Sequence, residues 1–378
     1  MARRKSRRKL SVGSVLLALL LFAIVVGGYY VYKTYFKKPQ TPPVTVEAKG
    51  AISFHFMMLG NDNAGDCTYI KAGDNDILID AGSRTNSIDD IDNYVKQYCT
   101  DGKLEYVIVT HADQDHIAGF SKKDGSIFDL YECQTIIDFP LTNKTTETYN
   151  NYVAERNDEV GLGGKRVSAL DCYNNVNGGQ RVYNLTADGN VKMEILYNYY
   201  YDHESSDENN YSVCVMFYHG DRRFLFTGDL EKEGEEKLAE KYDFTQVELF
   251  KAGHHGSPTS SNDCLLSEIK PKISVACCCA GSVEYTQNFA NTFPSQAYID
   301  RIAPYTDKVY VPIYVGVSFS EEKDKYVNGE TGLLNGNIQV ISDAETGVNV
   351  VGSNNSDKLK DTEWFKANRT MPTDWKTA

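Results

Sequence analysis

The sequence lacks several patterns that would point to common metal or redox folds. None of its nine cysteines forms a C-x-x-C pair, which excludes zinc ribbons and thioredoxin-like domains. An odd number of cysteines leaves at least one without a disulfide partner, even in an oxidising compartment. The stretch "SVACCCAG" is typical of a buried strand in which Cys serves as a small apolar side chain.

Acidic residues are absent from the first 38 positions, and residues 10–32 carry no charge at all. As a helix this uncharged segment would be roughly 34 Å long, enough to cross a bilayer core. Tyrosines and a second basic flank follow it, which favours an uncleaved anchor over a signal peptide. Six basic residues before the segment and three after it predict a cytoplasmic basic tail at 1–9, a transmembrane anchor at 10–32, and a body outside the cell.

Positive charge is scarce in the rest of the chain. Beyond residue 38 there are 30 Lys and Arg against 52 Asp and Glu, a net charge of −22. Such a body does not attract a polyanion through its overall field, so a nucleic-acid or phosphate substrate requires local cations or bound metal. Residues 33–50 include "PQTPPVTVEAKG", which predicts a non-helical linker between the membrane and the body.

Short strand-like and helix-like runs interleave from Ala51 onward. Runs such as "AISFHFMML", "CTYIKAG" and "LEYVIVT" predict strands, and "NSIDDIDNYVKQYC" has apolar positions at helical spacing. Helices are also expected at 125–133 and 145–160, a loop at 174–190, and an edge hairpin in "GNIQVISDAETGVNVVGS" before a polar tail. Several neighbouring strands are separated by hairpin-length turns, which favours a layered α/β sandwich over a simple parallel sheet.

Three predicted strands end in residues that can bind a metal. These residues are His111, Asp113, Asp115 and His116 after the first strand, Asp229 after the second, and His254 and His255 after the third. Side chains that follow a strand end can converge on one point, and a mixed set of imidazoles and carboxylates suits a hydrolytic dinuclear centre. The first motif taken alone is equally compatible with a solvated polar loop.

The motifs "THADQDHIAG", "LFTGD" and "LFKAGHHGS", in this order, resemble the metallo-β-lactamase fold. More narrowly, they are similar to the extracytoplasmic hydrolase domain of ComEC-type competence proteins, with "GDCTYIKAGDNDILIDAG", "ENNYSVCVMFYHG" and "LNGNIQVIS" as supporting stretches. The resemblance covers residues 51–345 and leaves 346–378 as a C-terminal extension. It implies an α/β fold, an αββα sandwich, with two divalent metal ions at one edge.

The resemblance also implies individual roles. His111 and Asp113 would bind the first metal, Asp115 and His116 the second, with Asp229 as a bridge and one or both of His254 and His255 completing the site. The implied catalytic residues are Asp115, Asp229 and His255. A carboxylate at Asp113 hardens the site, which leaves both Zn and Mn open. The residues Lys251, Ser257 and Thr259 flank the histidine pair; they are candidates to hold phosphate oxygens, or else form an ordinary strand end and helix cap.

The implied function is a membrane-anchored, extracytoplasmic phosphodiesterase or nuclease that cleaves DNA through a metal-bridging hydroxide. Two alternatives remain: a metallohydrolase of another ester, amide or thioester, and a non-catalytic binding module on the same fold. Three positions depart from the family pattern: Met58 replaces an Asp, Phe293 replaces a His, and His203 lacks the context of the usual loop ligand and is expected on the surface. The remaining histidines, His55 and His219, are expected to be packed rather than ligating.

Overall fold

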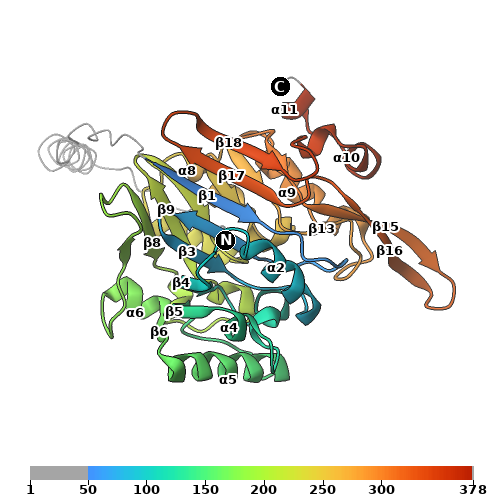
Figure 1. Ribbon diagram of the computed structural model, residues 1–378. Coiled ribbons are helices and arrows are strands. Elements are labelled where there is room, and N and C mark those ends of the chain that lie inside the picture. The colour runs from blue at the N-terminus through green and yellow to red at the C-terminus, as the bar shows by residue number, and fades with distance from the viewer. Residues whose placement is uncertain (1–49, 377–378) are drawn as a thin grey trace, which may run out of the picture. The chain divides into compact units, whose positions relative to one another are not determined.

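The computed structural model describes residues 50–376. The predicted basic tail and anchor, and all but the last residue of the predicted linker, lie outside this range. Within 50–376 no helix has both the length and the apolar character that a membrane crossing requires. The described chain forms two large mixed sheets and one small sheet, with helices on the outer faces (Figure 1).

The first sheet has eight strands in the order β18-β17-β1-β2-β3-β4-β5-β6. Their bounds are β1 Ala51–Phe56, β2 Thr68–Ala72, β3 Asn75–Ile79, β4 Lys103–Val109, β5 Glu132–Asp138, β6 Lys165–Ser168, β17 Ile338–Asp343 and β18 Gly347–Gly352. Pairing is antiparallel from β18 to β3 and parallel from β3 to β6. The β17–β18 hairpin lies at the edge of the sheet beside β1 (Figure 1), which confirms the predicted edge hairpin.

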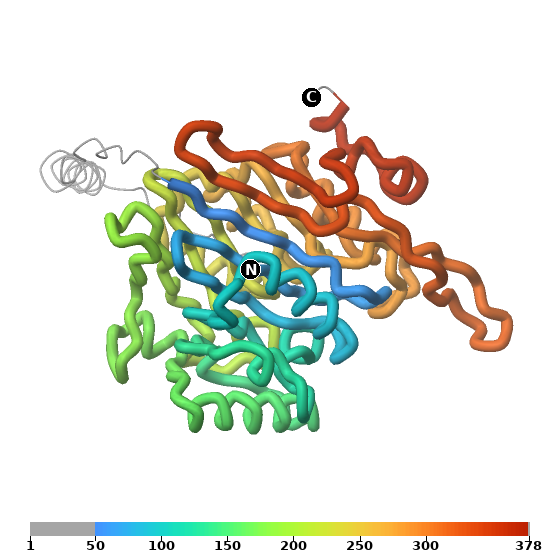
Figure 2. Tube along the Cα trace, viewed as in Figure 1, coloured from blue at the N-terminus to red at the C-terminus, as the bar shows by residue number. Residues whose placement is uncertain are grey.

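The second sheet has seven strands in the order β14-β12-β11-β10-β9-β8-β7. Their bounds are β7 Val182–Asn184, β8 Val191–Leu196, β9 Cys214–His219, β10 Arg222–Phe226, β11 Leu249–Lys251, β12 Ile273–Val275 and β14 Val309–Tyr310. The strands from β14 to β10 run parallel, and those from β10 to β7 antiparallel. A small third sheet contains β13 (Cys279–Ala280), β15 (Ile313–Ser320) and β16 (Lys325–Leu333), and its β15–β16 hairpin extends beyond the strands of the large sheets in Figure 2.

The two large sheets face each other across an aromatic core. The ring of Phe54 in β1 lies 4.7 Å from that of Phe224 in β10 and 5.5 Å from that of Phe217 in β9. The helices accompanying the first sheet are α2 Ile88–Val95, α3 Gln114–Ile117, α4 Ile127–Leu130, α5 Glu147–Leu162 and α6 Ala169–Asn174; those accompanying the second are α7 Lys232–Lys241, α8 Asp263–Ile269 and α9 Gln296–Ile302, followed by α10 Glu363–Asn368 and α11 Thr373–Lys376. In α2 the apolar positions Ile88, Ile91 and Val95 are buried, as their helical spacing predicted.

Several local predictions were wrong, and each error has a tertiary cause. The helix expected at 125–133 is the short α4, because from Glu132 the chain pairs with β4 as strand β5. The loop expected at 174–190 contains strand β7, which the pairing with β8 holds in place. The β15–β16 hairpin was missed although Val315, Val317 and Phe319 alternate with small residues in β15, because the outer halves of both strands are largely exposed and β16 carries no such alternation. The polar tail contains α10 and α11, whose two tryptophans and one phenylalanine are buried.

All nine cysteines lie within the described residues and are free thiols. Eight are buried, and Cys264 is intermediate. The adjacent residues Cys277, Cys278 and Cys279 are all at most 5% exposed. Their use as small apolar side chains is therefore confirmed.

The imidazole of His55 is buried among tyrosine rings on the first sheet. Its Nδ1 lies 2.9 Å from the Tyr94 hydroxyl and its Nε2 lies 2.8 Å from Ser53 Oγ. Burial lowers the pKa of His55 to about 4. Both His55 and His219 are at most 1% exposed, so the expectation that they pack rather than protrude is confirmed.

The burial of His55 predicts that the folded protein loses stability at acidic pH. Between pH 6.5 and about 4 the unfolded chain takes up a proton on this histidine while the folded chain does not, so the stability contribution is lost as the pH falls. We expect the free energy of unfolding to drop by about 3 kcal/mol across this window. Urea unfolding between pH 4.5 and 7.5 should show a smaller pH slope in H55Q than in the parent. The control H203Q changes an exposed histidine and should keep the parental slope; identical slopes in H55Q and H203Q would contradict the assignment.

Candidate functional site

The site forms where the ends of three strands meet between the two sheets. Strand β4 brings the "HADQDH" loop from the first sheet, and the parallel neighbours β10 and β11 bring Asp229 and His255 from the second. The loop is seated against the end of β3, where a Cβ on Gly82 would lie 1.5 Å from the Asp115 carbonyl oxygen. His255 has a φ of 56°, a left-handed conformation that is uncommon outside glycine and is found at functional sites.

The two imidazoles of His116 and His255 face the same carboxylate oxygen. His116 Nε2 lies 3.1 Å from Asp229 Oδ2, and His255 Nε2 lies 3.2 Å from it. On the opposite side of each ring, Nδ1 faces an oxygen that only accepts: Asp80 Oδ2 at 2.8 Å from His116, and the Cys277 carbonyl at 2.9 Å from His255. Each Nδ1 therefore carries a proton, and in the neutral rings both Nε2 lone pairs point at carboxylate oxygen.

A positive charge placed between the two rings and Asp229 would remove the repulsion between these lone pairs and the carboxylate oxygen. Either protons on both rings or a bound metal would supply it, and outer partners on Nδ1 are the usual way to orient a metal-binding histidine. Burial alone lowers the pKa of His116, but Asp229 and Asp80 outweigh it and hold this pKa well above its ordinary value. Burial raises the pKa of Asp229, yet His116, His255 and Lys251 bring it well below its ordinary value. The centre thus favours positive charge at the position between the rings.

The donor set and its burial fit a divalent metal. Ligand atoms of four buried residues lie within 4.8 Å of one another: Asp66, His116, Asp229 and His255. The Nε2 atoms of His111 and His255 are buried and form no hydrogen bond, and such atoms are costly unless a ligand pairs with them. We conclude that these residues fit a metal ion, and that Asp115, whose Oδ2 is 3.3 Å from His255 Nε2, lies close enough to share it.

Lys251 occupies the interior of this centre. Its ammonium forms an ion pair with Asp66 and lies 3.3 Å from both Asp229 Oδ1 and the Gly228 carbonyl. The side chain is 3% exposed. Burial lowers the pKa of Lys251, but Asp66 and Asp229 raise it above its ordinary value, so the group stays charged. Its contacts in the structure are with carboxylates of the centre, and its expected contact with phosphate stays a prediction.

Three predicted metal ligands, His111, Asp113 and His254, lie outside the four-residue cluster, and of these His111 is fully buried. His111 Nε2 is 3.6 Å from Asp113 Oδ2, and the other Asp113 oxygen forms an ion pair with Lys144. His254 is 22% exposed at its side chain; its Nδ1 is 3.3 Å from Glu231 Oε1, while its Nε2 is 4.0 Å from Asp229 Oδ2. Of the histidine pair, the structure therefore places His255 inside the centre and His254 at its edge.

The centre opens to a cleft of about 440 Å³. Its lining includes the cations Arg84 and Lys144 and the hydroxyl of Tyr285, which donates to Asp115 Oδ2 at 2.8 Å. Arg84 forms an ion pair with Glu284, as Lys144 does with Asp113. A substrate in this cleft would meet several carboxylates, the imidazole of His254 and the two paired cations.

The other candidate residues have plain structural partners. Ser257 Oγ and Thr259 Oγ1 are 2.8 Å apart, and Thr259 donates to Glu231 at 2.8 Å. Phe293, in the position where the family pattern has a His, stacks near His255 with ring centroids 5.9 Å apart. The expectation that His203 is a surface residue is confirmed, because its side chain is 45% exposed and stacks on Tyr199 at 3.7 Å.

Among the site residues that were not singled out from the sequence are Asp66, Asp80, Lys144 and Tyr285. A signal for two of them was present. Asp80 ends the apolar run "DILID", the same strand-exit pattern that marked His111, and Asp66 ends the loop "MMLGNDNAGD". The two others lie in segments with no chemical pattern, and only the fold brings them to the cleft.

The model of the Metallo-beta-lactamase superfamily matches residues 60–125 and 206–280. These two ranges contain the ligand-bearing loops described above. The chain contains a metallo-β-lactamase superfamily domain. Its two mixed sheets, enclosed by helices, form the metallo-β-lactamase fold. The expected resemblance and the core of the expected fold class are confirmed.

Curated relatives include two proteins with competence-related names. The chain is 24% identical to ComE operon protein 3 of Bacillus subtilis over 176 residues, which are 46% of this chain and 20% of that protein. It is 32% identical to competence protein ComA of Neisseria gonorrhoeae over 106 residues, 27% of this chain and 14% of that protein. The chain therefore spans no more than a fifth of the length of these relatives.

Solved structures include the metallo-beta-lactamase fold protein YhfI from Bacillus subtilis. It is 13% identical to this chain, covers 75% of it, and is itself covered to 99%, with a TM-score of 0.41. A diiron β-hydroxylase from Streptomyces venezuelae, CmlA, matches 60% of this chain at 10% identity and a TM-score of 0.34.

Asp80 should act as a positioning residue for His116. Thr110 donates to it from its backbone nitrogen at 2.8 Å and from its hydroxyl at 2.7 Å, so the carboxylate is fixed when it receives His116 Nδ1. We expect D80N to bind Mn²⁺ or Zn²⁺ about 10- to 100-fold more weakly, measured by chelator competition. D76N alters a buried carboxylate of β3, paired to Lys71, and should leave metal binding by the His116 centre unchanged. Equal metal affinity in D80N and the parent would exclude the role.

Proposed function

We propose that this chain is a membrane-anchored, extracytoplasmic phosphodiesterase that cleaves DNA in a metal-dependent reaction. The observation that carries the proposal is the convergence of two Nε2 lone pairs on a buried carboxylate, at the end of a cleft lined by Arg84 and Lys144. Bound divalent ions would polarise a phosphodiester oxygen and activate a water molecule there. The competence-related names of the relatives support DNA as the substrate.

The protein groups around the centre have separable tasks. The imidazoles of His116 and His255, together with Asp229, would bind the metal. Asp80 and the Cys277 carbonyl fix the orientation of the two rings. Burial raises the pKa of Asp115, but His255 and His116 bring it below its ordinary value, so this carboxylate stays ionised and acts as a ligand or proton acceptor. The Tyr285 hydroxyl orients it from the cleft side.

Two residues at the cleft border can serve the substrate. His254 is oriented by Glu231 and partly exposed, a geometry suited to giving a proton to the departing oxygen. Lys144 is paired to Asp113 and can turn from this carboxylate to a phosphate oxygen at short range. Lys144 and Arg84, the two cations that line the cleft, supply local positive charge, which the acidic body lacks overall.

The test compares metals and substrates on one preparation. The full chain in detergent is stripped with EDTA and supplied with Mn²⁺ or Zn²⁺, and then given bis-(p-nitrophenyl) phosphate, single-stranded DNA, double-stranded DNA, a chromogenic lactam and a thioester. We expect metal-dependent cleavage of phosphodiesters, with DNA among them. No metal-dependent turnover of any phosphodiester would overturn the proposal. Turnover of the lactam or thioester alone would identify another hydrolase, and bound metal without turnover would identify a binding module.

A further inference from the structure

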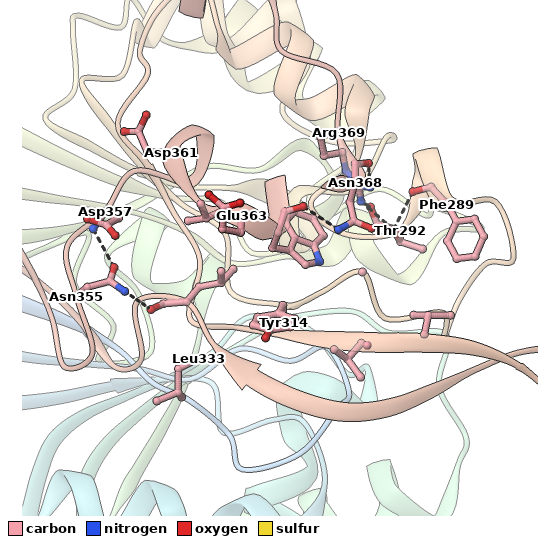
Figure 3. A pocket seen from close by; sticks show the side chains of 17 residues that line it. Phe289, Thr292, Tyr314, Leu333, Asn355, Asp357, Asp361, Glu363, Asn368 and Arg369 are labelled. Carbon is pink, nitrogen blue, oxygen red and sulfur yellow. Dashed lines mark hydrogen bonds between the residues drawn. The ribbon is translucent and has the colours of Figure 1, made fainter. Parts of the chain in front are cut away.

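A cavity of about 710 Å³ lies away from the metal-binding residues, between the β15–β16 hairpin and the C-terminal segment (Figure 3). Its lining residues fall between Gly281 and Arg369, beyond the residues that match the superfamily model. The volume is within the range of about 300–1,000 Å³ that is usual for small-molecule sites. The proposed phosphodiesterase chemistry makes no use of this cavity.

The indole N–H of Trp364 lines the cavity without a protein partner in the described part of the chain. Trp364 is 8% exposed as a residue. Its Nε1 forms no hydrogen bond within residues 50–376, while its backbone carbonyl accepts from the Asn368 side chain. The other tryptophan of the chain behaves ordinarily, since Trp375 Nε1 donates to the Thr306 carbonyl at 2.9 Å. An indole N–H that no protein group accepts is a donor that an oxygen of a ligand in the cavity could pair with.

Unpaired acceptors lie in the same lining. The carboxylates of Asp357 and Asp361 accept no hydrogen bond and join no ion pair within the described range, and Asn368 uses its amide nitrogen on the Trp364 carbonyl, at 2.7 Å, which leaves its side-chain oxygen free. The Tyr314 hydroxyl, labelled at the base of the cavity in Figure 3, also forms no hydrogen bond among residues 50–376. The lining thus offers both a donor and several acceptors.

The charge of the lining disfavours an anionic ligand. Asp357, Asp361 and Glu363 are all exposed at the cavity border. The one lining cation is Arg369, whose guanidinium donates to the carbonyls of Pro294, Thr292 and Asn368 and stacks 4.9 Å from the Trp364 ring. Because its donors are used on backbone oxygens, it has little left for a phosphate or carboxylate.

We propose that this cavity binds a neutral, hydroxyl-rich ligand, a saccharide. A hydroxyl both donates and accepts, so it can pair with the free carboxylates and with the indole N–H at once. The aromatic faces of Tyr314 and Phe289 suit the apolar face of a sugar ring. An anion is repelled by the acidic border, and a simple cation leaves the indole N–H without an acceptor.

The experiment uses the two tryptophans of the chain. In the full-length W375F variant, Trp364 is the single tryptophan and reports directly on the cavity. Chitotetraose and cellotetraose are titrated as neutral probes, spermidine as a cation and glycerol 3-phosphate as an anion. We expect saturable emission changes with a neutral oligosaccharide, and an affinity about fivefold weaker when Y314F or D361N is added. Y326F changes a tyrosine outside the cavity and should leave the affinity unchanged.

Three results would overturn the saccharide assignment. The first is no saturable response to either oligosaccharide up to about 10 mM, in a variant that thermal unfolding shows to be folded. Binding weaker than this would be too weak for a specific site. The second is a response to spermidine or glycerol 3-phosphate alone. The third is an oligosaccharide affinity that Y314F and D361N both leave unchanged. None of these results depends on whether phosphodiesterase activity is found.

Discussion

We expect the D229A variant to lose at least about 10³-fold in metal-dependent phosphodiester turnover. Asp229 Oδ2 lies between His116 Nε2 at 3.1 Å and His255 Nε2 at 3.2 Å, so its removal deletes the oxygen on which both rings converge. Loss of a ligand to a catalytic metal removes several kcal/mol of transition-state stabilisation. The measurement is initial rates with bis-(p-nitrophenyl) phosphate and single-stranded DNA at saturating Mn²⁺.

The matched control is D243A, which removes an exposed carboxylate a short distance along the chain. This variant should turn over at the parental rate. D115A tests the neighbouring ligand and should also lose most activity, because Asp115 Oδ2 is 3.3 Å from His255 Nε2. Undiminished turnover in D229A and D115A together would show that the chemistry takes place elsewhere.

The K251M variant should be strongly destabilised in the absence of metal. Lys251 is the buried ammonium that neutralises Asp66 and Asp229, and its loss leaves two buried carboxylates without their cation. Breaking a buried ion pair in this way costs about 3–5 kcal/mol. Because a divalent ion would replace part of the missing charge, we expect Mn²⁺ to restore stability more in K251M than in the parent. Urea unfolding with EDTA and with Mn²⁺ measures both effects.

The control for this experiment is K103M, which disrupts the exposed ion pair between Lys103 and Glu132. Exposed pairs are screened by solvent, so this variant should unfold like the parent with or without metal. If K251M is destabilised to the same extent in EDTA and in Mn²⁺, Lys251 is a packing residue and its charge is not coupled to a metal centre.

Local patterns predicted part of the site and missed the rest for a physical reason. His111, Asp115, His116, Asp229 and His255 were found because each follows an apolar strand, and a strand exit is visible in the letters. Asp80 shows the same pattern, but it was interpreted as part of the predicted strand. Asp66 lies in a loop whose length departs from the family pattern. Lys144 and Tyr285 come from segments that only tertiary packing brings to the cleft.

Strands were predictable where one face or both faces of the strand are buried. They were not predictable where pairing with a neighbouring strand decides whether a segment becomes a strand. The alternation of apolar residues identified the core strands, while β5, β7 and the β15–β16 hairpin form because neighbouring strands pair with them. The C-terminal segment appears polar by composition, yet Trp364, Phe365 and Trp375 are buried there.

The sequence by itself determined the sandwich class, the three ligand-bearing strand ends and the excess of acid over base, because each depends on residue order alone. Only the tertiary structure decided between His254 and His255 for the interior, since both have the same local motif and differ in what surrounds them. It also placed Lys251 between Asp66 and Asp229, although Lys251 follows Asp66 by more than 180 positions in the chain. Electrostatic neutralisation requires contact in space, and the sequence carries no direct record of that distance.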